Sequence, residues 1–201
     1  SLQEGNIEIA KKLINAGADL NIQNRNRDTV LMLAVKKGYL EIIKDLIAKG
    51  VNLNKIDIDG NTALMKATQE GDAKILSYLI ESGAKVDIKD NDGMTALMWA
   101  AIDGDVEVVK KLVAKGANLD KQDNDGNTAL IIAAQEEHIE VAKQLIEAGA
   151  NLDIKDNNKD TALIRAVIRG HIEIVKCIVG AGSSLNIQDE KGKTAIHLAI
   201  E

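Results

Sequence analysis

The sequence predicts an all-α repeat protein, and three observations support this fold class. Threonines recur every 33 residues, at Thr29, Thr62, Thr95, Thr128, Thr161 and Thr194. Each threonine is followed by an aliphatic residue two positions later and by alanine five positions later, which is helical spacing. Phe is absent and aromatics make up only 1% of the chain, so small aliphatic side chains must fill thin, regular layers. A fixed period of this length is typical of a repeat fold.

Each repeat is expected to contain two short helices and a polar turn. In the third repeat, residues 95–103 form one apolar helical face that ends before Gly104, and residues 105–115 form another that ends before Gly116. The polar segment 117–127 carries an Asp-Asn-Asp-Gly turn signal. Helices of about ten residues are too short to be stable alone in water, so stacking on neighbouring repeats must stabilise them.

The 33-residue period divides the chain into one repeat domain, residues 1–201. The expected full units are 24–56, 57–89, 90–122, 123–155 and 156–188, flanked by partial units 1–23 and 189–201. Solenoids normally need polar capping repeats at their ends. The partial units therefore leave open that the chain is a fragment of a longer protein.

Three segments of the third repeat identify a family. Residues 93–101 read GMTALMWAA, residues 104–113 read GDVEVVKKLV, and residues 116–120 read GANLD. They resemble the ankyrin repeat motifs GxTPLHxAA, GHxEVVKLLL and GADVN, and the resemblance covers essentially the whole chain. It implies an α-solenoid with a helix-turn-helix and a β-turn finger in each 33-residue repeat. It also implies protein binding through the fingers and through a concave face lined by the first helix of each repeat.

Several positions depart from the ankyrin pattern. The proline after each threonine is missing, and the histidine of the motif survives only as His197, so the threonine hydroxyl is expected to cap the helix without an imidazole partner. Arg27 and Lys159 replace the finger glycine, which leaves the shape of those two turns open. Glu137 replaces a helix-ending glycine, and a positive φ there would cost roughly 1 kcal/mol.

The positions that vary between repeats favour an adjustable binding surface. The fourth, seventh and eighth residues after each threonine share the helix face opposite the packing face, and they differ from copy to copy. A solvated face under relaxed constraints would show the same variation. The candidate partner-binding residues are Lys66, Glu70, Asp92, Met94, Trp99, Ile102, Asp103, Asp125, Ile132, Glu136, Arg165 and Arg169. Trp99 is the only tryptophan, and it fits both an interface anchor and packing between adjacent first helices.

Charge along the repeats indicates the chemistry of the partner. The net charge of -6 argues against nucleic acid as the main ligand. Cations concentrate in the first repeat and in the last ones, while carboxylates dominate the middle repeats. The cations near the end are Lys155, Lys159, Arg165, Arg169, Lys191 and Lys193. This pattern predicts a protein or peptide partner with a basic central segment, although solvated surface charge would explain the outer cations equally well.

No motif for catalysis, a cofactor or a metal ion emerges. The segment Asp90-Asn91-Asp92-Gly93 has the composition of a calcium loop, but its register places Ile88 and Trp99 where carboxylates are required. The histidines follow the repeat pattern and do not cluster by spacing, and no phosphate-binding loop or nucleophile elbow is present. We therefore expect no enzymatic activity and no cofactor.

The most direct interpretation is a non-enzymatic protein-protein interaction module. The lone Cys177 and the absence of a long apolar run predict an intracellular, cytoplasmic monomer that does not enter membranes, with secretion as an effector left open. A competing interpretation is the targeting or regulatory part of a larger protein whose catalytic or effector domain lies outside this chain. An engineered scaffold is a third, against which the irregular residues Lys66, Glu137 and Gly180 argue.

Overall fold

The computed structural model describes residues 2–201, with side chains from Asn6 onward. It divides into two compact units, Ser1–Asn91 and Asp92–Glu201, and each is described by itself. All regular secondary structure in the described residues is α-helical, in twelve helices without a strand. The predicted all-α fold class is confirmed.

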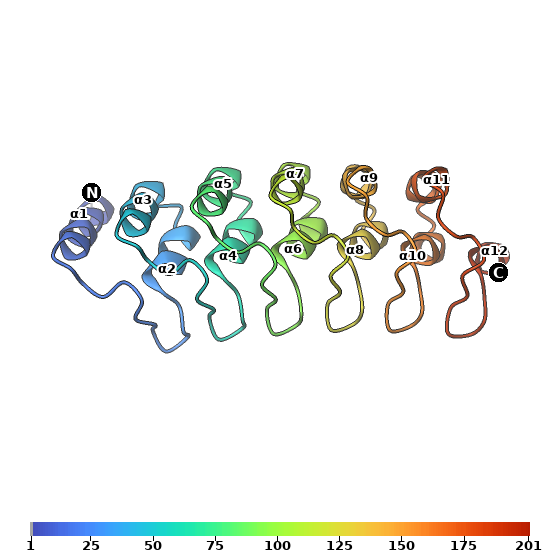
Figure 1. Ribbon diagram of the computed structural model, residues 1–201, viewed down its shortest axis with the longest axis horizontal. Helices are drawn as coiled ribbons and strands as arrows, with labels where there is room; N and C mark the ends of the chain where they lie inside the picture. The colour runs from blue at the N-terminus through green and yellow to red at the C-terminus, as the bar shows by residue number, and fades with distance from the viewer. Residues whose placement is uncertain (1) are drawn as a thin grey trace. The chain divides into compact units, whose positions relative to one another are not determined.

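Unit 1 contains five helices. They are α1 (Leu2–Asn15), α2 (Val30–Lys36), α3 (Leu40–Ala48), α4 (Ala63–Gln69) and α5 (Ala73–Glu81). The first helices of the repeats, α2 and α4, pack against each other, and each also packs on the second helix of its own repeat, α3 or α5. Helix α1 packs on α3 and so extends the row of second helices (Figure 1).

Unit 2 repeats the same arrangement with seven helices. They are α6 (Ala96–Asp103), α7 (Val106–Ala114), α8 (Ala129–Gln135), α9 (Ile139–Glu147), α10 (Ala162–Arg169), α11 (Ile172–Gly180) and α12 (Ala195–Ile200). The first helices α6, α8, α10 and α12 pack in sequence, and the second helices α7, α9 and α11 form the row beside them (Figure 1). The two helices predicted for residues 95–103 and 105–115 are confirmed to within one residue at their ends.

The repeated threonines begin the first helices. The hydroxyls of Thr29, Thr62, Thr95, Thr128 and Thr161 accept the backbone N–H three residues later at 3.2 to 3.4 Å. The predicted capping role is confirmed. Where the sequence has methionine in place of the motif histidine, its sulfur takes over part of the missing contact, because the N–H of Thr29 lies 3.4 Å from Sδ of Met32. Sulfur is a weak acceptor, so the hydroxyl carries most of the cap.

An aspartate, or Asn24 in the first repeat, stands at the start of each finger and holds the turn. Oδ1 of Asp57, for example, accepts the N–H groups of Asp59 and Asn61 at 3.0 and 2.8 Å. Asp123, Asp156 and Asp189 make the same pair of bonds in their own fingers. The turn geometry therefore comes from a side chain that repeats with the 33-residue period.

The two fingers without glycine keep the same turn. Arg27 and Lys159 adopt φ of 59° and 63°, and their N–H groups bond to Asn24 and Asp156 at 2.9 Å. Glycine is required where fingers touch most closely, since a Cβ on Gly93 would lie 2.8 Å from the backbone nitrogen of Asn124. The question that the sequence left open for Arg27 and Lys159 is settled in favour of an unchanged finger.

Glu137 ends α8 in the left-handed conformation predicted for it. Its φ is 62°, close to the 70° and 75° of the glycines that end α6 and α10. A side chain with a Cβ is strained there by about 1 kcal/mol. This position stores backbone strain that the neighbouring repeats avoid.

The hydrophobic core runs between the two rows of helices. Leucines two residues after the first five threonines and the aliphatic residues on the facing side of α3, α5, α7, α9 and α11 are almost completely buried. Each such side chain contributes about 1.5 to 3 kcal/mol relative to an exposed one. The short helices are therefore stabilised by stacking on one another, as expected from the sequence.

Candidate protein-interaction surface

The predicted partner-binding residues of unit 2 fall into exposed and buried groups. Ile102 and Asp103 end α6 with exposed side chains, and Glu136 is exposed at the equivalent end of α8. Asp92 and Asp125 are exposed on successive fingers. These five residues comprise four exposed carboxylates and one exposed aliphatic side chain, and they form the accessible part of the candidate surface.

Met94 and Ile132 lie beneath that surface. Their exposed fractions are only 7% and 8%. A side chain with so little accessible area can make little direct contact with a partner. It can act mainly by supporting the exposed residues above it. The sequence assigned both residues to the candidate binding face, and it did not predict how deeply they are buried.

Trp99 is partly buried in the middle of α6. Its backbone N–H donates to the carbonyl oxygen of Thr95 at 3.1 Å, as expected within the first turn of a helix. Its side chain lies between the buried residues Met98 and Ala100 in sequence and keeps part of its surface accessible. Partial exposure fits a packing role and an anchor role alike, since an interface anchor also needs one accessible ring face.

Asp103 holds an unfavourable charge. Burial raises the pKa of its carboxyl, nearby Asp105 raises it further, and the ring of His138 opposes both by lowering it. The residue is also the last one of α6, where the partial negative charge of the helix end disfavours a carboxylate. An added positive charge beside Asp103 would therefore relieve a cost already present in the folded protein.

Two histidines connect adjacent repeats next to this surface. Nε2 of His138 lies 2.8 Å from the carbonyl oxygen of Ile102, and Nε2 of His171 lies 3.2 Å from that of Gln135. Both carbonyls belong to the last turn of a first helix. Nδ1 of His171 also lies 3.5 Å from a carboxylate oxygen of Glu137. These rings fix the ends of α6 and α8 and so position Asp103 and Glu136.

The predicted cationic residues Arg165 and Lys66 are engaged within the chain. Nε of Arg165 donates to Oδ2 of Asp156 at 2.8 Å and lies 3.3 Å from Oδ2 of Asp160. In unit 1, Nζ of Lys66 lies 2.6 Å from Oδ2 of Asp57 and 3.7 Å from Oδ1 of Asp28. Arg165 ties α10 to the finger of its own repeat, and Lys66 ties α4 to the fingers of its own repeat and of the preceding one. A partner could reach only the small exposed part of either side chain.

The two remaining candidates, Glu70 and Arg169, are both exposed. Glu70 follows the last residue of α4 and is exposed, and Arg169 is exposed in the last turn of α10. Both stand at the same repeat position as Asp103 and Glu136, eight residues after a threonine. This position is therefore exposed in each of the four repeats where the sequence predicted a contact.

Two of the six cations in the C-terminal repeats are paired within the chain. Arg165 is paired as described, and Nζ of Lys193 bonds to Oε2 of Glu201. A groove of about 420 Å³ lies there, lined by Ile168, Leu198, two lysines and several carboxylates. The carboxylates are Asp160, Asp189, Glu190 and Glu201. Burial raises the pKa of Asp160 more than Arg165 lowers it, and the surrounding carboxylates add to the rise.

The buried aspartates were the functional support that sequence reasoning missed. The sequence did not single out Asp57 or Asp156 as site residues, yet each bonds to backbone in its finger and to a cation on a first helix. A signal was present, because an Asp or Asn stands five residues before every repeated threonine. The other part of the signal is that only two repeats, those of Asp57 and Asp156, also carry a cation four residues after the threonine, at Lys66 and Arg165.

The structure also bears on metal ions, the cysteine and membranes. Among residues 2–201 the structure brings together no three His, Cys, Asp or Glu side chains able to hold a metal ion. Cys177 is half-buried on α11 and carries no disulfide. None of the helices described combines the length and apolar character needed to cross a lipid bilayer.

Known proteins provide the remaining comparison. Residues 1–90 and 86–156 match a family model described as ankyrin repeats (3 copies), and residues 145–199 match one described as ankyrin repeats (many copies). Comparison with curated proteins finds no match. Among solved structures, the chain is similar to the crystal structure of the ankyrin repeat domain of Bcl-3, described as a unique member of the IkappaB protein family. The two are 27% identical with a TM-score of 0.90, over 98% of this chain and 90% of that one.

Ankyrin repeats are generally protein-protein interaction modules and typically non-catalytic. The motifs around the repeated threonines, the paired helices and the family models agree over almost the entire sequence. The chain belongs to the ankyrin repeat family.

Proposed function

We propose that this chain is a non-enzymatic module that binds a protein segment with a cationic centre. The binding surface is formed by the ends of the first helices and the tips of the fingers. The observation that carries the proposal is the carboxylate of Asp103, which lies next to the exposed Ile102 in sequence and is itself accessible to a partner. Partial burial nevertheless raises the pKa of Asp103. A lysine or arginine of the partner would bond to this carboxylate while its aliphatic stem covers Ile102.

The neighbouring charges support the same partner chemistry. Asp92, Asp125 and Glu136 are exposed in the same unit as Asp103. Complementary charge raises the association rate and fixes the orientation of a bound segment. The groove near Asp160 and Glu190 extends this acidic character toward the C-terminal repeats. We accordingly propose that the partner is also cationic in the part that contacts the second half of this chain.

The paired residues serve the surface indirectly under this proposal. Arg165 and Lys66 hold fingers against first helices through buried carboxylates. A finger that is already fixed loses less conformational entropy when a partner binds. Their direct contact with the partner is secondary to this positioning role. We also propose an intracellular location, consistent with a single cysteine and no disulfide.

Peptide binding tests the proposal directly. One pool of peptides carries Lys or Arg at its central positions between neutral flanks, and a matched pool carries Asp or Glu there. Fluorescence of Trp99, the only tryptophan, reports binding without a label. We expect the cationic pool to bind and the acidic pool not to bind, with affinity falling as salt concentration rises. Equal binding of both pools, or binding that ignores salt, would contradict the proposal.

Three substitutions separate the anchor role of Trp99 from its packing role. The triple variant Trp99→Ala, Asp92→Asn, Asp125→Asn should lose binding, and a variant with only the two aspartate changes should lose part of it. Thermal unfolding of all variants is measured in parallel, and binding of the variants is followed with labelled peptides. Lost binding with an unchanged unfolding transition makes Trp99 an anchor. Retained binding with a lower transition temperature makes it a packing residue.

A further inference from the structure

The residue that precedes each second helix differs between repeats, and two of these residues are histidines. The position lies ten residues after the repeated threonine and is occupied by Tyr39, Asp72, Asp105, His138 and His171. Asp72 and Asp105 cap their helices with side-chain oxygens. His138 and His171 make no hydrogen bond of this kind. The two histidines therefore forgo a helix cap that the same position provides in the second and third repeats.

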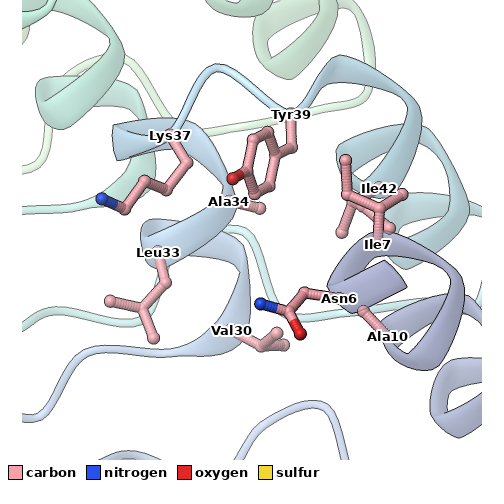
Figure 2. Close-up of a pocket in the computed structure, with 9 residues that line it drawn as sticks. All are labelled: Asn6, Ile7, Ala10, Val30, Leu33, Ala34, Lys37, Tyr39 and Ile42. Atoms are coloured by element: carbon pink, nitrogen blue, oxygen red, sulfur yellow. The ribbon is translucent and has the colours of Figure 1, made fainter. Parts of the chain in front are cut away.

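In the first repeat this position contributes to packing. Tyr39 lines an almost entirely apolar groove of about 170 Å³ together with Ile7 and Ile42, and Lys37 lies at the same groove (Figure 2). Of the three residue types at this position, only histidine ordinarily changes its charge between pH 5 and 8. Proton uptake near neutral pH is therefore expected at this position only in the fourth and fifth repeats.

The ring of His138 lies across the end of α6. Its Nε2 is 2.8 Å from the carbonyl oxygen of Ile102, and a Cβ on Gly104 would lie 2.6 Å from its Nδ1 and Cε1. A carbonyl oxygen only accepts hydrogen bonds, so Nε2 carries a proton and donates it, and Nδ1 is the atom that takes up a second proton. The positive charge of the protonated ring is then placed against Gly104, the residue that follows Asp103.

The helix ends around His138 are acidic. Their carboxylates are Asp103 at the end of α6, Asp105 before α7, Glu136 and Glu137 after α8, and Glu140 in the first turn of α9. Lys143 bonds to Glu140 at 2.7 Å and offsets that carboxylate. The N-terminus of α9 disfavours a positive charge on His138, and the carboxylates oppose that effect. Burial and Asp105 raise the pKa of Asp103, and His138 lowers it. Because such charge effects are reciprocal, a protonated His138 and an ionised Asp103 stabilise each other.

His171, at the start of α11, repeats this arrangement with a different carboxylate. Its Nε2 lies 3.2 Å from the carbonyl oxygen of Gln135, and its Nδ1 lies 3.5 Å from Oε2 of Glu137. Glu137 stands at the repeat position of Gly104. A second proton on His171 is therefore matched by a carboxylate within the same contact, whereas a second proton on His138 acts on Asp103.

We propose that a proton on His138 competes with the cationic segment of the partner for Asp103, so that binding weakens as pH falls from 7.5 to 5.5. The inference rests on the proposed function, in which a lysine or arginine of the partner bonds to Asp103. Neutral His138 leaves the negative charge of Asp103 available to the partner. Protonated His138 compensates that charge from within the chain and repels the incoming cation. A pair of charges near the surface changes affinity by about two- to fivefold.

Binding of the labelled peptide pool with Lys or Arg at its centre is measured at pH 7.5 and 5.5 and at one ionic strength. Wild type should bind about two- to fivefold more weakly at pH 5.5. His138→Gln keeps an N–H donor for the carbonyl of Ile102 and has no titratable ring, so most of this difference should disappear. The chain has three histidines, and His197→Gln, on α12, is the control that should keep the wild-type difference. Loss of the difference in His171→Gln but not in His138→Gln would overturn the proposal, because it would assign the effect to Glu137.

A second measurement tests the charge coupling without a peptide. The carboxyl carbon resonance of Asp103 is followed by NMR as pH changes, and the pKa of Asp103 should rise in His138→Gln, because the charge that lowers it is gone. Circular dichroism at both pH values checks that each variant stays helical, and His138→Asn provides a second variant without a titratable ring. An unchanged pKa of Asp103, or a pH difference in binding that survives in both His138 variants, would overturn the proposal. Absence of any binding by wild type at pH 7.5 would contradict the proposed function itself, and this inference would fall with it.

Discussion

Nε of Arg165 donates a 2.8 Å hydrogen bond to Oδ2 of Asp156, whose side chain is only 1% exposed. Oδ1 of the same carboxylate accepts the N–H groups of Asn158 and Asp160 at 2.8 and 2.9 Å. One buried aspartate therefore joins a first helix to its finger through three partners. Arg165 occupies a position that varies between repeats, and here its side chain holds the finger rigidly against α10.

Arg165→Ala should destabilise the folded chain by about 2 to 4 kcal/mol, because it leaves the buried carboxylate of Asp156 without its cation. Arg169→Ala removes an exposed arginine from the same helix and should stay within about 0.5 kcal/mol of wild type. Urea unfolding measures both. Equal stability of the two variants would show that the Arg165 pair contributes nothing net.

Gly104→Ala should be more damaging than Gly170→Ala. Both glycines have a positive φ, so both substitutions carry a backbone strain of about 1 kcal/mol. A Cβ on Gly104 would also lie 2.6 Å from Cε1 and Nδ1 of His138, whereas one on Gly170 meets nothing within 4 Å. We expect an additional loss of about 1 to 2 kcal/mol at Gly104 from this overpacking.

The double variant Gly104→Ala, His138→Ala checks the cause of that loss. Removing the ring removes the clash, so the cost of Gly104→Ala measured in the His138→Ala background should fall to that of Gly170→Ala. Thermal or urea unfolding gives the four values of the cycle. An unchanged cost in that background would mean that the histidine ring is not the obstacle.

Glu137→Gly should raise the melting temperature. The substitution removes the strain of a Cβ at φ of 62°, worth about 1 kcal/mol, which corresponds to roughly 2 to 4 °C for a chain of this size. Glu137→Ala keeps the Cβ and loses only the contact of its carboxylate with His171, so it should bring no gain. Differential scanning calorimetry distinguishes the two. A lower melting temperature for Glu137→Gly would show that the carboxylate contact outweighs the strain.

Asp103→Asn should stabilise the chain at neutral pH. Burial raises the pKa of Asp103 in the folded state, so the folded state binds more protons than the unfolded one in the window above the ordinary aspartate pKa of about 3.9. Wild-type stability therefore falls as pH rises through that window, and it stays lower above it. The D103N variant lacks this loss, so its advantage at pH 7 should shrink toward zero as pH falls below about 3.5. Urea unfolding at several pH values measures the difference, and a gain independent of pH would assign it to packing.

Most of the fold could be predicted because its signals repeat with the sequence. The threonines, the leucine two residues later and the helix-ending glycines predicted two helices in each repeat, and the resemblance to the ankyrin motifs predicted how they pair. The shape of the fingers at Arg27 and Lys159, which the sequence left open, matches the others because Asn24 and Asp156 bond to the backbone of their fingers.

The candidate surface was harder to predict because it depends on contacts between residues that the period does not reveal. Met94 was placed on the binding face, but its burial depends on how closely neighbouring elements pack over it. Arg165 was read as an accessible cation, and the carboxylates that bind it come from a finger nine and five residues earlier. Asp103 was predicted from its position alone, and its raised pKa required knowledge of burial and of His138 across the repeat boundary.

The most direct test of the proposed function maps the bound surface. Amide resonances of ¹⁵N-labelled protein are recorded while the peptide pool with cationic centres is added, with the acidic pool as a control. The largest shifts are expected around Ile102, Asp103, Asp125 and Glu136, and they should shrink in the D103N variant. Shifts confined to the second helices α7, α9 and α11, or equal shifts with the acidic pool, would contradict a cation-binding surface at the ends of the first helices.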